Sequence, residues 1–476
     1  MVSGQVKSFT VRVNKKDVVA SALPLQEHWL PLSNLDLLLP LLDVGVFFCY
    51  GVSKPTSFAS MVGVLKKALA QALVSFYAFA GEVVHNPDGE PELLCNNRGV
   101  DFIEAFADVE LCHLNLYNPD DCVEGKLVPA KKHGVLAVQA TELKCGGIVV
   151  ACTFDHRIAD AYSANMFLVS WANMSQSKPF SLLPSFRRSL LNPRRPGLFH
   201  PSLDDMYVPV SALPPPKDSP SAADHLISRI YYVKAEQLER LQALCNNKRT
   251  KLESFSAFLW KMVAEGAALD GSEKVCKMGI VVDGRRRLSS TVDDEVEEDN
   301  GSADKGINVI RSARSALMES YFGNVLSIPF GGKKVEELVE KPLGWVAGEV
   351  HEFLEGAVTK EHFLGLIDWV EARRPVPGLA RIYCRGSEDG PAFVVSSGQR
   401  FPVSKIDFGW GKPVFGSYHF PWRGDAGYVM PMPSPAGNGD WVVYMHMPKK
   451  QLEVIEKEAS HVFRPFKFEY LNIFKN

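Results

Sequence analysis

The stretch from Ile148 to Trp171 constrains the fold most strongly, because its hydrophobic pattern changes period in the middle. Up to Phe154 it consists of β-branched and small apolar residues, which predict a buried strand. After Asp160 the apolar side chains recur at the spacing of one helix face. The sequence therefore predicts a buried strand that leads through a short turn into an amphipathic helix.

The turn between this strand and helix contains His156, and Asp160 follows four residues later. A strand end can hold a side chain rigidly in a cleft, and a histidine with an ordinary pKa of about 6.5 can act as a base near neutral pH. The spacing alone carries little weight, because His200 and Asp204 repeat it in a proline-rich context. On this basis alone, the favoured interpretation of His156 is a hydrogen-bonded structural histidine.

The size and charge of the chain limit its organisation and its partners. At 476 residues it is too long for one ordinary core, which predicts two large domains. With 46% hydrophobic and 22% charged residues, it has the composition of a globular protein. The net charge of −3 gives no basic footprint for nucleic acid or for a membrane surface. We therefore expect small-molecule partners.

Targeting signals and cysteines indicate a cytoplasmic protein. Residues 1–16 lack the apolar core of a secretory signal, and the apolar run 35–50 is interrupted and too short to span a bilayer. The nine cysteines contain no C-x-x-C pair, which argues against a disulfide framework and against a zinc site. We expect small buried cysteines in a reducing cytosol, and no bound metal.

Proline divides the chain into two parts. Ten of the 31 prolines lie between Pro179 and Pro220, a density that sustains neither a helix nor a central strand. We therefore predict an N-terminal domain over residues 1–178, a proline-rich crossover linker over residues 179–224 and a C-terminal domain over residues 225–476.

Hydrophobic periodicity predicts the main elements of both domains. Strands are expected over residues 9–13, 44–50, 134–143, 148–154, 227–233, 275–282, 393–396, 428–432 and 441–447. Helices are expected after a cap at Thr56 or Ser57, after Asp160, after a capping box of Thr250 and Glu253, and over residues 235–246, 335–354, 360–371 and 451–459.

Two charged segments follow in the second half. Residues 283–287 read DGRRR at the end of a predicted strand, where arginines can hold a carboxylate or a phosphate as well as form a solvated face. Residues 292–306 carry seven acidic side chains, all of them within residues 293–304. This segment cannot bury enough apolar area to order itself, so we predict a mobile surface insert.

Residues 407–411 read DFGWG. The first three letters occur in the magnesium loop of protein kinases, but the chain has neither the glycine-rich phosphate loop nor the H-R-D catalytic loop that accompany it. Two glycines around Trp410 indicate a tight and specific backbone instead.

Together these motifs resemble the paired signatures of the plant BAHD acyl-CoA-dependent acyltransferases. Residues 156–160 match the H-x-x-x-D motif, and residues 407–411 match the D-F-G-W-G motif. Supporting blocks stand at residues 143–147, 283–287 and 321–324. The order of the five blocks spans nearly the whole chain and favours a catalytic His156. Another segment, residues 25–36, is similar to enzymes that acylate coniferyl alcohol and related phenylpropanoids, including hydroxycinnamoyltransferase-like members.

The resemblance implies an α/β fold of two similar domains, each a mixed β-sheet flanked by helices, with an active-site channel at the domain interface. It implies a monomeric enzyme of plant specialised metabolism that binds no cofactor and uses acyl-CoA as a co-substrate. CoA is expected to enter from one side and the acceptor from the other, so that they meet at His156.

Chemistry explains why such residues would serve. A thioester is already activated, so the enzyme needs only a base for the attacking alcohol or amine and support for the oxyanion. His156 is the expected base, and the resemblance suggests the indole N–H of Trp410 as the oxyanion donor. It also implies that Asp160 points away from the cleft and pairs with an arginine, either Arg285 or Arg287.

Other expected site residues are structural or lie on the acceptor side. Asp407 is expected to brace its own loop, in which Gly409 and Gly411 shape the backbone. Gly398 stands where many relatives of the family have a tryptophan, which predicts a wider acceptor pocket. Asp43 replaces a small polar residue near the acceptor, so we expect a carboxylate that faces the substrate.

Four functions remain open at the level of sequence. The leading one is transfer of an acyl group from acyl-CoA to the hydroxyl of a phenylpropanoid alcohol. The second is N-acylation of an amine, for which Asp43 would supply the counter-charge. The third is a catalytically silent binding protein on the same fold. The fourth is a carrier-protein-dependent condensation domain, which would prefer a second histidine where Asp155 stands. The acyl group and the acceptor cannot be read from scattered pocket loops.

Overall fold

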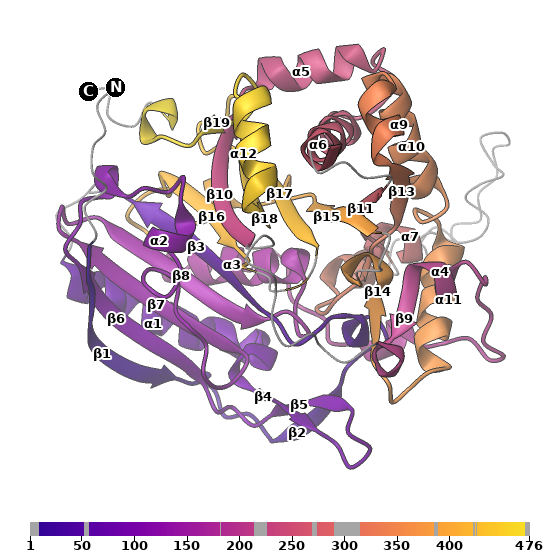
Figure 1. Ribbon diagram of the computed structural model, residues 1–476. Helices are drawn as coiled ribbons and strands as arrows, with labels where there is room; N and C mark the ends of the chain where they lie inside the picture. The colour runs from indigo at the N-terminus through magenta and orange to yellow at the C-terminus, as the bar shows by residue number, and fades with distance from the viewer. Residues whose placement is uncertain are drawn as a thin grey trace, which may run out of the picture.

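The chain forms two α/β halves, each built on its own mixed sheet with helices packed against it (Figure 1). The computed structural model describes residues 9–51, 57–180, 182–213, 226–268, 274–289, 315–384, 389–421, 424 and 426–471. In Figure 1 the first half occupies the lower left and the second half the upper right. This arrangement confirms the predicted fold class. The acidic insert at residues 293–304 lies outside the described residues.

The first sheet has six strands in the order β1-β6-β7-β8-β3-β16. Only β6 and β7 run parallel to each other. The strands are β1 (Val11–Val19), β6 (Val100–Ala107), β7 (Leu136–Leu143), β8 (Ile148–Asp155), β3 (Asp43–Tyr50) and β16 (Phe415–His419). The predicted hairpin of β7 and β8 is confirmed. The sequence did not predict β16, which comes from the second half and completes the sheet of the first.

Two helices of the first half, α1 (Phe58–Ser75) and α3 (Ala161–Ser175), pack against each other. Ser57 caps α1, as predicted, by accepting a hydrogen bond from the backbone N–H of Ser60 at 3.3 Å. The indole of Trp171 on α3 donates to the carbonyl of Leu65 on α1 at 3.0 Å. By length and composition α1 could also cross a membrane, but its apolar stripe lies in the core.

The second sheet follows the order β12-β11-β15-β17-β18-β10-β19, with β13 paired to β11. Its strands are β12 (Leu326–Ser327), β11 (Val275–Asp283), β15 (Asp389–Ser396), β17 (Gly427–Pro433), β18 (Trp441–Pro448), β10 (Leu226–Val233), β19 (Arg464–Pro465) and β13 (Phe330–Lys334). The pairs of β15 with β11 and with β17 are parallel. All of these strands come from beyond residue 225, whereas β16, also from this part of the chain, belongs to the first sheet.

Helix α6 (Lys251–Ala268) is the central helix of the second half and packs against α5 (Ala235–Leu244), α9 (Val335–Glu340), α10 (Leu343–Glu355) and α12 (Lys449–Glu458). Its predicted capping box is present, because Thr250 and Glu253 exchange hydrogen bonds of 2.7 and 3.2 Å. The single helix predicted over residues 335–354 is wrong. It is two helices, since Pro342 has no N–H to continue the first and caps the second.

The remaining elements are short or lie between the halves. In the described part of the predicted linker, β9 (Tyr207–Pro209) pairs with β14 (Gly378–Ala380), so this crossover is tied to the second half. A small sheet of β2 (His28–Pro31), β5 (Pro91–Cys95) and β4 (Glu82–His85) extends below the first half in Figure 1. Further helices among the described residues include α2 (Pro119–Cys122), α4 (Leu203–Met206), α7 (Arg285–Ser289), α11 (Lys360–Glu371) and the single turns η1 (Asp36–Leu38) and η4 (Arg188–Leu191).

Candidate active site

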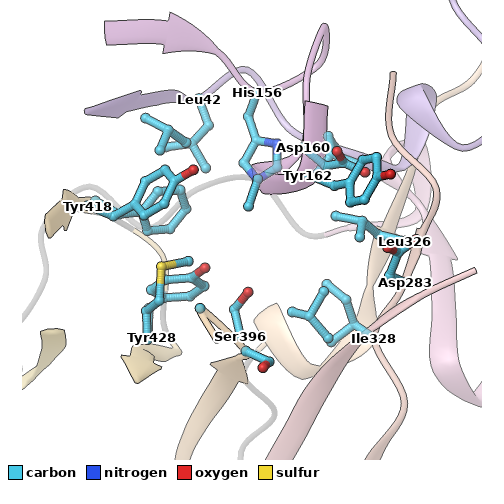
Figure 2. A pocket seen from close by; sticks show the side chains of 18 of the residues that line it. Leu42, His156, Asp160, Tyr162, Asp283, Leu326, Ile328, Ser396, Tyr418 and Tyr428 are labelled. Carbon is cyan, nitrogen blue, oxygen red and sulfur yellow. The ribbon is translucent and has the colours of Figure 1, made fainter. Parts of the chain in front are cut away.

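His156 follows β8 directly and points into a cavity of about 330 Å³ between the two halves (Figure 2). Its backbone N–H donates to the carbonyl of Leu42 at 2.9 Å, which fixes the turn to the start of β3. Strand, turn and helix are therefore arranged as the sequence predicted. The cavity wall combines residues of β3, β8 and α3 with residues of β11, β12 and β17, so both halves build it.

The surroundings of His156 favour the neutral form of its imidazole. Burial lowers its pKa below the ordinary value, and the nearby backbone, Asp160 and Asp155 oppose this only in part. The Nδ1 atom is buried inside the protein. The nitrogen left to face the cavity is therefore Nε2, and in a neutral ring with a proton on Nδ1 this atom carries the lone pair that accepts a proton.

Asn324 holds the turn that carries His156, a role that the sequence did not reveal although its motif was noted. Its side-chain amide donates to the carbonyls of His156 and Arg157 at 2.9 and 3.1 Å and to Asp36 at 2.9 Å. Its backbone N–H also donates to Asp36, at 2.7 Å. The Asn324 side chain raises the pKa of His156 slightly by hydrogen bonding, against the larger effect of burial. It thus links the turn of the first half to the second half.

Asp160 caps α3 and pairs with an arginine, as the family resemblance implied. One carboxylate oxygen accepts from the backbone N–H of Ser163 at 2.9 Å. Arg285 donates to both oxygens, at 2.7 and 3.1 Å, and the two side chains are only 2% and 1% exposed. Arg285 is therefore the partner, while Arg287 is exposed on α7. Because these hydrogen bonds stabilise the charged carboxylate and hold it in place, we expect Asp160 to organise the turn and not to act as a base.

The DFGWG loop is braced by its own aspartate, as predicted. One oxygen of Asp407 accepts from the backbone N–H groups of Gly409 and Gly411, at 2.8 and 3.0 Å. Both glycines have positive φ angles, of 109° and 113°, which side-chain-bearing residues rarely adopt. The Asp407 carbonyl also accepts a hydrogen bond from Gln176, just beyond the end of α3.

Trp410 does not reach the cavity. Its ring packs edge-on against Tyr50 at 6.0 Å and stacks on Phe408 at 5.6 Å, and it is 7% exposed. It is not among the residues that line the cavity around His156. The expectation that its indole supports the oxyanion is therefore not met by the geometry, because the tight loop turns the ring into the aromatic core of the first half.

Gly398 lines the cavity, but it does not leave an empty place there. A Cβ atom added to it would lie 2.6 Å from Cγ of Met432 and 2.8 Å from the carbonyl of Pro431, both on β17. The direction of a side chain is thus into the neighbouring strand and not into the cavity. The predicted widening of the acceptor pocket at this position is wrong, and the glycine allows two backbones to approach closely.

Asp43 faces a different cavity from His156. Side chains alternate between the two faces of a strand, and in β3 this alternation turns Val44 toward the His156 cavity and Asp43 away from it. Asp43 forms an ion pair with Lys131 at 3.1 Å instead. The expectation of a carboxylate facing the acceptor beside His156 is therefore wrong.

The second histidine–aspartate pair with the same spacing, His200 and Asp204, is structural. His200 is exposed and hydrogen bonds only locally, to Ser202 at 2.8 Å. Asp204 accepts from the indole of Trp369 at 2.8 Å and from Arg373 at 2.7 Å. Neither residue lines the His156 cavity.

The cavity itself is mainly apolar and aromatic, with a few fixed polar groups. Tyr418 donates its hydroxyl to Asn165 at 2.9 Å, and the hydroxyl of Tyr207 accepts from the backbone N–H of Ile328 at 2.9 Å. Figure 2 shows Tyr418 and Tyr428 on one wall and Ile328, Leu326 and Asp283 on the other. Such a chamber suits a mainly apolar small molecule with few polar atoms.

A group of possible metal ligands lies apart from this chamber. Glu110, Cys112 and His113 have ligand atoms within 4.8 Å of one another, mostly on the surface, and none of them lines the cavity. Among the described residues the chamber offers His156, Asp160 and Asp283 as its acidic or imidazole groups, and Asp160 is already held by Arg285.

Comparisons with known proteins agree with this geometry. Residues 9–297 and 307–462 match the family model described as the Transferase family. Shikimate O-hydroxycinnamoyltransferase of Nicotiana tabacum is 25% identical, covering 92% of this chain and 96% of its own. (Z)-3-Hexen-1-ol acetyltransferase of Arabidopsis thaliana is 27% identical, covering 96% and 95%. An N-hydroxycinnamoyltransferase of Avena sativa, which acts on 5-hydroxyanthranilate, is 26% identical, covering 85% and 89%.

Solved structures share the fold. Vinorine synthase superposes with a TM-score of 0.68 at 20% identity, covering 96% of this chain and all of its own (100%). The TRI101 protein of F. sporotrichioides, in complex with coenzyme A and T-2, superposes with a TM-score of 0.69 at 14% identity, covering 90% and 95%.

Proposed function

The chain belongs to the Transferase family, the BAHD acyltransferases, and we propose that it transfers an acyl group from acyl-CoA to the hydroxyl of an aromatic, phenylpropanoid-type alcohol. Acyl transfer as such follows from the family and excludes the catalytically silent binding protein. The observation that carries the proposal is His156, with Nδ1 buried and a pKa lowered by burial, on the wall of an aromatic chamber shared by both halves.

The chemistry needs no covalent enzyme intermediate. As the acceptor oxygen attacks the thioester carbonyl, Nε2 of His156 takes the hydroxyl proton. The tetrahedral intermediate then collapses, the carbon–sulfur bond breaks, and the imidazolium returns the proton to the sulfur of CoA. The products are an ester and free CoA, and the histidine is neutral again. Burial favours this cycle, because it keeps the resting ring uncharged.

The chamber supports an aromatic alcohol as the acceptor more than a charged amine. Apolar and aromatic side chains supply most of its surface, among them Leu38, Val44, Phe154, Phe420, Tyr428 and Met430. The amine alternative depended on Asp43 as a counter-charge, and this residue is turned away and paired with Lys131. The relative from Avena sativa is an N-acyltransferase, so amines belong in the test. For a condensation domain, Asp155 occupies the place of the second histidine and is buried against Arg157.

A release assay tests the proposal. The purified protein is incubated with a panel of acyl-CoAs against matched aromatic alcohols and aromatic amines, and free CoA is measured with a thiol reagent. We expect turnover with aromatic alcohols that exceeds turnover with the matched amines. Faster turnover of the amines would replace this proposal by N-acylation, and no CoA release with any pair would refute both.

Two histidine variants connect the activity to the site. His156→Ala should stay folded and lose about a hundredfold to ten-thousandfold in turnover, the usual contribution of a general base. The matched control His200→Ala should stay within about threefold of the parent, since an exposed surface ring contributes little. A monomeric state and a cytoplasmic location also remain part of the proposal, in keeping with nine free cysteines.

A further inference from the structure

A second cavity, of about 520 Å³, lies on the other face of the first sheet. The sheet itself separates it from the His156 cavity. Phe154 on β8 and Val44 on β3 are paired neighbours that face His156, whereas the next pair, Thr153 and Gly45, faces the second cavity. His419 on β16 continues that second row beside Gly45. The strand alternation thus places two chambers back to back.

Leu42 is the one residue that lines both chambers, as far as the described residues of each wall extend. It stands immediately before β3, where the sheet ends, so its side chain takes the place of the sheet as the partition. Its carbonyl accepts the backbone N–H of His156, which holds this partition next to the base. Figure 2 shows the Leu42 side chain beside the imidazole.

The second chamber is more polar than the first, and its acidic groups are more exposed than its basic ones. Asp43 pairs with Lys131 at 3.1 Å, and Glu124 with His419 at 2.5 Å. The acidic side chains are 36% and 53% exposed, while their basic partners are 11% and 1% exposed. Carboxylate groups are therefore the more accessible charged groups of this chamber, which favours a hydrogen-bond donor with a positive charge.

We propose that Leu42 is a specificity-determining residue that limits the acceptor on this side, and that the chamber behind it favours an ammonium-ended tail once a smaller residue at this position opens it. This inference rests on the proposed acyl transfer at His156. In the native enzyme, leucine stops an acceptor whose tail branches from the carbon next to the reacting hydroxyl. A smaller residue joins the chambers and admits that tail, whose charge then meets Asp43.

Three aromatic alcohols with the same ring test this inference. The first has no tail, the second has a butyl-length tail on the carbinol carbon, and the third has the same tail ending in a primary ammonium group. For the native enzyme we expect kcat/KM for both tailed alcohols to be about tenfold to two-hundredfold below that for the tail-less one. The reason is that the tail would collide with the Leu42 side chain.

Leu42→Ala should raise the ratio of tailed to tail-less kcat/KM by about tenfold or more, with the larger gain for the ammonium tail. Adding Asp43→Asn to this variant should remove most of that charge preference, about tenfold. The matched control is Leu39→Ala. Leu39 also lines the His156 cavity, and its replacement removes the same side-chain volume, but Leu39 does not border the second chamber. Its ratio should stay within about threefold of the parent.

The outcomes separate this inference from the proposed function. A native enzyme that acylates no tail-less alcohol overturns both. A native enzyme that accepts tailed and tail-less alcohols equally, or a Leu42→Ala ratio that equals the parent or the Leu39→Ala ratio, overturns only the role of Leu42. Melting curves accompany each variant, and Leu42→Val, which removes less volume, should give an intermediate ratio if Leu42→Ala does not fold.

Discussion

Burial of Nδ1 leaves one ring nitrogen of His156 for the proposed proton transfer, and burial of the ring decides how the activity should respond to pH. A buried imidazole resists protonation, so its pKa lies below the ordinary value of about 6.5. The base form is then present at and above pH 6.5 and is lost only as the pH falls through the lower folded-state pKa.

A pH profile checks this sign. We expect the acid limb of kcat/KM, which reports the free enzyme, to have its midpoint below about 6.5. The limb should disappear in His156→Ala, whose residual activity has no base to titrate. A midpoint above about 6.5 would mean that a nearby negative charge, and not burial, dominates the histidine.

Asn324 gives a second residue-scale prediction. Its side chain raises the pKa of His156 and anchors two carbonyls of the turn, so Asn324→Ala should move the acid limb to lower pH and reduce kcat together. Pre-steady-state binding of acyl-CoA should change less than kcat, because the residue acts through His156. A variant with reduced stability but an unmoved acid limb would show that Asn324 serves only the fold.

Asp160 is the third case, and here the cost falls on stability. Asp160→Ala leaves the buried Arg285 with only Asp283, at 3.2 Å, as a charged partner, which should lower the free energy of unfolding by up to about 3–5 kcal/mol and reduce activity as the turn loosens. Asp160→Asn, which keeps the shape and the cap of α3, should be milder. Denaturant unfolding beside turnover decides the matter: full stability with no turnover would place Asp160 in the chemistry.

At the scale of elements, the sequence predicts regular segments better than it predicts which face a residue occupies. Local periodicity and caps were enough for α1, α3 and the hairpin of β7 and β8. The face of Asp43 was not readable, because a shift of one residue at the start of β3 reverses it. The strand β16 was missed since its pairing partner β3 lies far away along the chain. The positions of His156 and Asp160 were predictable because the strand and the helix on either side of them are set by the pattern of neighbouring residues.

Gly398 carries the element-scale prediction. Its φ is not in the left-handed region, so the cost of a side chain comes from contact with β17 alone. Gly398→Ala should lower the free energy of unfolding by about 1–3 kcal/mol through overpacking. The control Gly348→Ala, within α10 and with no atom within 4 Å of the added Cβ, should be neutral or stabilise by up to about 1 kcal/mol. Equal melting temperatures for the two variants would contradict the close approach of the strands.

At the scale of the whole molecule, the second half of the chain contributes β16 to the first sheet, which makes the first half dependent on the second. β3 is buried along nearly its full length between β8 and β16, and its side chains include Phe47 and Phe48 in the core. β16 also places Tyr418 in the His156 cavity and His419 in the second chamber. The site therefore exists only in the joined molecule, which a sequence division at residue 178 does not show.

Separating the halves tests this dependence. A fragment of residues 1–178 retains β3 but loses β16, so the row of backbone N–H and C=O groups along an apolar strand becomes an open edge. We expect this fragment to aggregate on size exclusion and to melt without a cooperative transition. Co-expression with residues 179–476 should restore a soluble complex, because the missing strand is supplied in trans. A monomeric fragment with a sharp melting transition would show that the first half folds alone and that β16 is only an addition to its edge.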